Sequence, residues 1–186
     1  MSEAVFGLVG VILGSVISIF GSWFLMCCKR ERDARHLASR ITYQLDEYVL
    51  RCVHVAHDYG PNEPDDGSVT DKSPPSPPVY PNDVDWSSID DNLMYRILAL
   101  PCKAQYVHII VSTAFYNSSQ VDIEDAVEEQ QLRYSELGIE AYEITKILRN
   151  TYRIPHGNIG ELYGEPSHVI LREKVDKIEE KRSRTT

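Results

Sequence analysis

The chain has 186 residues, 42% of them hydrophobic, and a formal net charge of −9. This length suffices for one domain of roughly 100–150 residues with attached segments. The acidic balance opposes binding to the phosphates of nucleic acids, so we expect no nucleic-acid partner. The four cysteines have no paired spacing, as in compartments where thiols stay reduced. They are Cys27, Cys28, Cys52 and Cys102.

A transmembrane helix is predicted over residues 4–28. No charged residue lies between Glu3 and Lys29, and a helix of that length measures roughly 37 Å, which exceeds a hydrocarbon core of about 30 Å. A cleaved signal peptide is disfavoured because the preceding residues carry no positive charge and the apolar run is about twice the usual length. We therefore expect an uncleaved anchor.

Basic residues set the expected orientation of this anchor. Only Glu3 precedes the span, whereas four cations follow it within one or two turns. Lys and Arg are retained on the cytoplasmic side. We therefore expect a single-pass cell-membrane protein with its N-terminus outside and its C-terminal domain cytoplasmic. The cations that set the topology and contact lipid headgroups are Lys29, Arg30, Arg32 and Arg35.

Residues 29–59 are predicted to form an amphipathic juxtamembrane helix, the first helix of a bundle. Leu37, Ile41 and Leu45 recur at the spacing of one helical face. The sequence leaves open whether this helix continues the anchor or bends near Lys29. Residues 60–84 are rich in Pro and Asp and nearly without apolar content, so we expect a flexible loop.

The remaining bundle helices are predicted within 85–182, followed by a tail over 183–186. A first helix beyond Trp86 carries Pro101 in its pattern, which predicts a kink or a split, and Ser88 is its expected N-cap. A second spans about 121–152 and a third about 166–182. No strand-like alternation is present. The predicted fold is therefore all-α, one N-terminal transmembrane helix followed by an antiparallel bundle of about four cytoplasmic helices. The expected core of the 121–152 helix includes Leu137, Ala141 and Ile144.

Small residues follow one face of the transmembrane segment, within an arc of roughly 80° at 100° per residue. Bulky residues such as Val16 lie on the opposite face. A stripe of this kind lets another helix approach closely, so we expect it to associate with a second copy or with a partner transmembrane helix. The stripe consists of Gly7, Gly10, Gly14, Ser18 and Gly21.

The 60–84 segment also contains a proline motif. Residues 72–78 match K-x-x-P-x-x-P, a ligand for aromatic-lined grooves, and Ser73 and Ser76 each precede a proline. The alternative is that the run is a stiff linker. The sequence does not decide between a docking motif and a linker.

Motifs for catalysis or metal binding are weak. His54 and His57 lie three residues apart on one helix, but no partner pair is apparent, and no Glu-x-x-His occurs. We therefore expect no metal and no cofactor. Arg149 and His156 loosely resemble the R-x4–6-H motif of HEPN-type helical ribonucleases. Similar pairs recur at Arg30/His36 and Arg51/His57, so the motif has little specificity.

Two functions remain after these exclusions. The first is a membrane-anchored helical scaffold that associates through its small-residue face and binds a cytosolic protein. The second is a membrane-tethered helical enzyme or toxin of the HEPN-like ribonuclease type that uses Arg149 and His156. The scaffold is favoured because no residue set identifies a substrate or a reaction.

Overall fold

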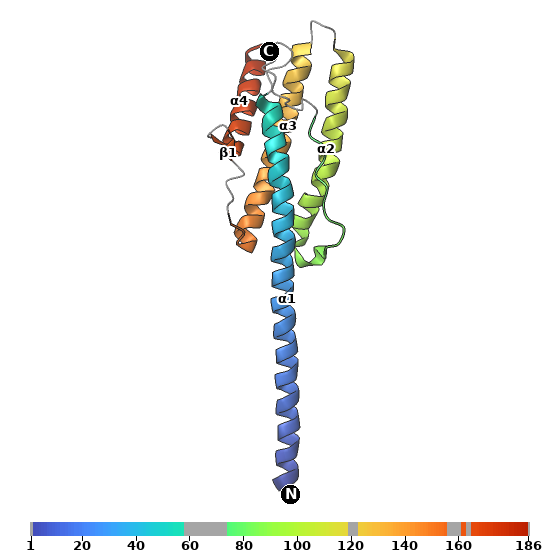
Figure 1. Ribbon diagram of the computed structural model, residues 1–186, viewed down its shortest axis with the longest axis vertical. Coiled ribbons are helices and arrows are strands. Elements are labelled where there is room, and N and C mark those ends of the chain that lie inside the picture. The colour runs from blue at the N-terminus through green and yellow to red at the C-terminus, as the bar shows by residue number, and fades with distance from the viewer. Residues whose placement is uncertain (1, 58–73, 119–122, 156–160, 163–164, 186) are drawn as a thin grey trace.

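The computed structural model describes residues 2–57, 74–118, 123–155, 161–162 and 165–185. For residues 2–12, 161–162 and 185 it describes the backbone alone. Within this part of the chain the protein is helical and forms a bundle, as the apolar periodicity predicts. One long helix extends well beyond the bundle at its N-terminal end (Figure 1).

That helix is α1, which runs without interruption from Ser2 to His57. Its 56 residues correspond to about 84 Å at 1.5 Å per residue. The question that the sequence left open is answered: the apolar segment and the first bundle helix are one continuous rod. Residues from Ala34 onward bury one face in the bundle, and the earlier residues project from it (Figure 1).

Three further helices complete the bundle. A short 3-10 helix, η1 (Trp86–Ser88), precedes α2 (Asp91–Asn117), which is followed by α3 (Ile123–Tyr152) and α4 (Ser167–Thr185). α3 is central because it packs against α1, α2 and α4, whereas α1 and α2 have few direct contacts. α2 is continuous through Pro101, so the expected split is absent.

The expected antiparallel order is wrong for α1 and α2, which run in the same direction; α3 runs antiparallel to all three other helices (Figure 1). The reason is residues 74–84, which return along α1 and carry the chain back to the base of the bundle. Arg51 bonds to Ser76, whereas Arg30, lower on α1, bonds to Ser87. The 11 residue steps from Ser76 to Ser87 can span about 34 Å when extended, which is enough to cover about 32 Å for the 21 helical steps from Arg30 to Arg51.

Residues 74–84 therefore differ from the expected flexible loop, while residues 58–73 of that loop lie outside the described part. Pro75 and Pro78 are buried, and Tyr80 and Val84 pack against the core. Tyr80 also meets the Trp86 ring edge-on at 5.9 Å. Composition favoured disorder, but proline and tyrosine supply enough apolar surface to dock this segment on the bundle.

The core contains the expected side chains of α3. Leu137, Ala141 and Ile144 are all buried, which confirms the helical phase read from the sequence. Two local expectations need correction. Asp90, not Ser88, caps α2, because its carboxylate accepts from the amides of Asn92 and Leu93. A short antiparallel pair also forms, with β1 (Glu161–Leu162) beside β2 (Glu165–Pro166).

Candidate functional site

The small-residue stripe lies on the part of α1 that projects from the bundle. A Cβ added at Gly14 or Gly21 would meet no atom within 4 Å, and Ser18 is exposed. The side chains of residues 7 and 10 lie outside the described part. Large apolar side chains are exposed around the stripe, at Leu13, Val16, Ile17, Ile19, Phe20, Trp23, Phe24, Leu25 and Met26.

The basic residues after this segment are exposed at the base of the bundle, and two of them also contact it. Arg30 donates from Nη2 to the backbone oxygen of Ser87 at 2.9 Å. Arg35 donates from Nη2 to the backbone oxygen of Arg153 at 3.3 Å. These two cations therefore join α1 to η1 and to the residue that follows α3, a role that the sequence did not indicate.

A second apolar surface lies on α2, opposite the face that it buries. Tyr106 is 65% exposed and Tyr116 is 90% exposed, and their neighbours at helical spacing form one stripe on the solvent side. We call this the α2 stripe. Its members are Tyr95, Leu98, Tyr106, Ile109 and Tyr116.

Sequence reasoning missed the α2 stripe, although its spacing was available. Leu93, Ile97 and Leu100 already complete the buried face that periodicity predicts for this helix. Spacing alone therefore gave the residues of the α2 stripe no separate role. Among the residues whose side chains the structure describes, which leave out residues 2–12 of α1, α2 is the one helix that is long and apolar enough to cross a membrane by length and composition. Its Lys103 is paired with Glu140 of α3 at 2.5 Å. An ion pair with a neighbouring helix and a buried apolar face are both typical of a helix that packs in a bundle.

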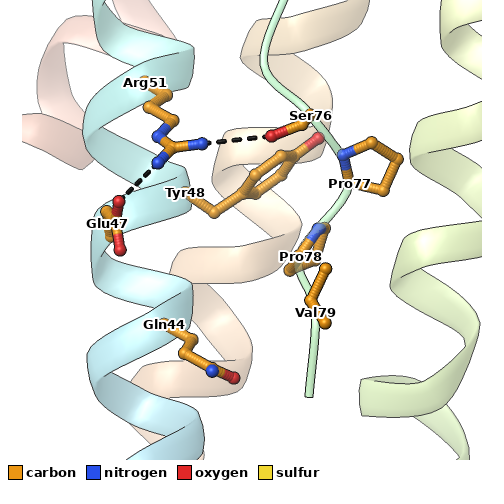
Figure 2. A pocket seen from close by; sticks show the side chains of 8 residues that line it. All are labelled: Gln44, Glu47, Tyr48, Arg51, Ser76, Pro77, Pro78 and Val79. Carbon is orange, nitrogen blue, oxygen red and sulfur yellow. Dashed lines mark hydrogen bonds and ion pairs between the residues drawn. The ribbon is translucent and has the colours of Figure 1, made fainter.

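A shallow pocket of about 290 Å³ lies where residues 74–84 cross α1. Figure 2 shows Tyr48 directed from α1 toward the proline segment, with Arg51 above it between Glu47 and Ser76. Arg51 donates from Nη1 to Ser76 Oγ at 3.1 Å and from Nη2 to Glu47 Oε1 at 2.5 Å. The pocket is lined by Gln44, Glu47, Tyr48, Arg51, Ser76, Pro77, Pro78 and Val79.

Of the two candidate ribonuclease residues, Arg149 alone is described by the structure. Arg149 donates from Nη2 to Asp46 Oδ2 at 2.5 Å, and about a tenth of each side chain is exposed. His156 lies outside the described residues. A guanidinium that is buried in an ion pair between two helices acts in the packing of the bundle.

Titratable groups in the core are held in their neutral forms. Burial raises the pKa of Tyr48 and of the Cys52 thiol well above their ordinary values, and burial raises the pKa of Tyr134 to about 12. A thiol that stays protonated is a poor nucleophile and a poor metal ligand. Among the described residues, no group of three or more His, Cys, Asp or Glu side chains could hold a metal ion.

Comparison of the chain with models of protein families, with curated protein sequences and with solved structures gives no match.

Proposed function

We propose that the protein is a single-pass membrane protein that works by binding other proteins. Residues 4–28 form the anchor, the N-terminus faces outward, and the bundle is cytoplasmic. The observation that carries the proposal is the projecting part of α1, where apolar side chains such as Ile17 and Phe20 are exposed. Monomeric soluble proteins rarely expose so large an apolar surface, whereas a lipid bilayer covers it.

Self-association through the small-residue stripe is the first part of this function. At 100° per residue, the stripe around Gly14 lies roughly opposite the bundle-facing side of α1, which includes Ile41 and Leu45. Two copies joined through the stripe would thus carry their bundles on the outside, without collision. The same outward face continues on the cytoplasmic part of α1 with Tyr43, which is exposed.

Recruitment of a cytosolic protein is the second part, and the α2 stripe is the surface that supports it. Exposed tyrosines are common at the centres of protein interfaces, because they bury much area at low cost in side-chain entropy. A pocket of about 230 Å³ adjoins the stripe at Tyr106, with Val107, Ile110 and Leu137 as its apolar lining. The expected partner surface is apolar, with polar groups at its rim to meet Lys103 and Glu140.

Substitutions in the membrane helix test the proposal. Gly14→Leu fills the stripe and should abolish crosslinking between copies of the full chain in membranes, while insertion persists because the segment becomes more apolar. Val16→Leu is the matched control, since Val16 lies on the bundle side of the helix, and it should crosslink like the parent. If both variants crosslink like the parent, the stripe is not the interface.

A further inference from the structure

Residues 74–80 have a burial pattern that repeats every three residues. Pro75 and Pro78 are buried, Ser76 and Val79 are exposed, and the residues between them are partly buried. A polyproline II helix has three residues per turn, so one edge of such a helix faces the bundle and another faces solvent. The two buried prolines are those of the K-x-x-P-x-x-P motif.

Ser76 lies on the exposed edge and is held at a cation. Its Oγ accepts from Arg51 Nη1 at 3.1 Å, and the other terminal nitrogen of Arg51 is held by Glu47 (Figure 2). Pro77 follows it directly. The structure thus combines an exposed serine hydroxyl, a following proline, an extended backbone and an arginine in hydrogen-bond reach.

We propose that Ser76 is a phosphorylation site for a proline-directed serine kinase, and that the phosphoserine binds Arg51 and holds residues 74–84 on α1. In the transfer, Ser76 Oγ attacks the γ-phosphorus of a nucleoside triphosphate and forms the new O–P bond. The bond from that phosphorus to its bridging oxygen breaks, the nucleoside diphosphate leaves, and the hydroxyl proton passes to the kinase's base.

Arg51 has the donors for this role. A guanidinium offers five N–H groups in a planar fork that suits phosphate, so it can bind the phosphoryl oxygens from Nη1 while Nη2 keeps Glu47. A phosphoserine carries about −1.5 to −2 charges and three acceptor oxygens in place of one hydroxyl. The negative charge of Glu47 opposes part of the attraction between the phosphate and Arg51. Arg51 is also half exposed, so solvent screens this attraction.

The burial of the two motif prolines determines when the kinase can act. Because Pro75 and Pro78 are buried in the docked segment, a kinase that binds an extended peptide acts on the segment when it has left α1. The modified segment then returns to a stronger contact at Arg51. Phosphorylation therefore favours the state in which the two motif prolines are covered, and it withholds them from any aromatic-lined groove.

The test uses the full chain in detergent micelles, with Ser73→Ala to remove the neighbouring Ser-Pro. A proline-directed kinase with ATP should add one phosphate at Ser76, located by mass spectrometry. Amide hydrogen exchange at Val79 and Tyr80 should then slow by about threefold, the factor expected for a half-exposed ion pair. Arg51→Gln should remove this slowing. Arg40→Gln is the matched control, since Arg40 pairs with Asp83 further along the segment, and it should retain the slowing.

A ³¹P titration of the phosphoserine reports on its contact with Arg51 through the pKa of the phosphate. This readout does not depend on how much the contact stabilises the docked segment. The second pKa of the phosphate should lie below its usual value of about 6 in the parent, and at about 6 in Arg51→Gln. The proposal is overturned if Ser76 takes up no phosphate. It is also overturned if exchange at Val79 and Tyr80 is unchanged or faster, or if the titration is the same in the parent and in Arg51→Gln.

Discussion

The Asp46 carboxylate and the Arg149 guanidinium meet 2.5 Å apart between α1 and α3, with about a tenth of each side chain exposed. They are 103 residues apart in the chain, so the pair joins α1 to α3, the central helix of the bundle. Removing one partner leaves the other charge largely desolvated and takes away this ion pair. The pair gives Arg149 a role in packing α3 against α1.

Replacing Arg149 with Met should destabilise the bundle by about 3 kcal/mol, because the largely buried Asp46 carboxylate then loses its ion pair with the guanidinium. Chemical denaturation of the full chain in detergent, followed by circular dichroism, measures this loss. Arg172→Met is the matched control on α4, since Arg172 pairs with Glu143 at a more exposed site, and it should cost less than about 1 kcal/mol. Equal, small losses would contradict a packing role for Arg149.

Gly138 is required where α3 approaches α1 and α4. A Cβ at this position would lie 2.8 Å from Cys52 Cβ and 2.8 Å from Leu171 Cδ1. Gly138→Ala should therefore destabilise the bundle by about 1–3 kcal/mol, despite the better helix propensity of alanine. Gly14→Ala meets nothing within 4 Å and should leave the stability of the bundle unchanged. A stabilised Gly138→Ala variant would mean that the helices are further apart than described.

Two cysteines should differ in reactivity because of their places in the bundle. Cys52 is fully buried and Cys102 is exposed on α2, and burial raises the pKa of the Cys52 thiol. In a chain with Cys27→Ser and Cys28→Ser, a maleimide at pH 7.5 should label Cys102 within minutes and Cys52 only after denaturation. Rapid labelling of Cys52 in the folded chain would show that the core opens between α1 and α3.

His168 should make the bundle less stable in mild acid. Burial, with Arg172 and Lys146 nearby, lowers the pKa of His168 below its ordinary 6.5, and its ring stacks on Tyr142 at 4.4 Å. As the pH falls, His168 binds a proton in the unfolded chain before it does so in the folded chain. The contribution of neutral His168 to the free energy of unfolding is therefore fully present above about pH 6.5, and it is lost as the pH falls through the lower pKa of the folded state.

Melting curves at pH 7 and pH 5 measure this effect. His168→Phe keeps a stacking ring but does not titrate, so its melting temperature should fall less on acidification than that of the parent. His36→Gln, at an exposed position on α1, should fall as the parent does. An equal fall for His168→Phe would place the acid sensitivity in other groups.

The helices and their buried faces were predictable because apolar periodicity is a local property of the sequence. Leu137, Ala141 and Ile144 were placed correctly on α3 from spacing alone. Residues 74–84 were not, because their docking depends on contacts with α1 and with the core that only the folded bundle provides. The direction of α2 follows from the same segment, so both errors have one cause.

The candidate surfaces also differ in whether the sequence alone could predict them. The small-residue stripe could be read from α1 alone, since every member lies on one helix. The buried pairing of Arg149 could not, because Asp46 lies 103 residues away. The α2 stripe was readable in principle, but a second apolar face is recognised as exposed only when the first has been shown to fill the core.

The account depends most on residues 4–28 crossing the membrane with the bundle in the cytoplasm. A reporter that is active only in the cytoplasm, fused after Thr186 of the full chain, tests this directly when it is paired with alkaline extraction of the membranes. We expect an active reporter that remains in the membrane pellet, and its release into the soluble fraction when Ile12, Val16 and Ile19 are replaced by Asp. An inactive reporter, or an active one that alkaline extraction releases from the parent, would contradict the account.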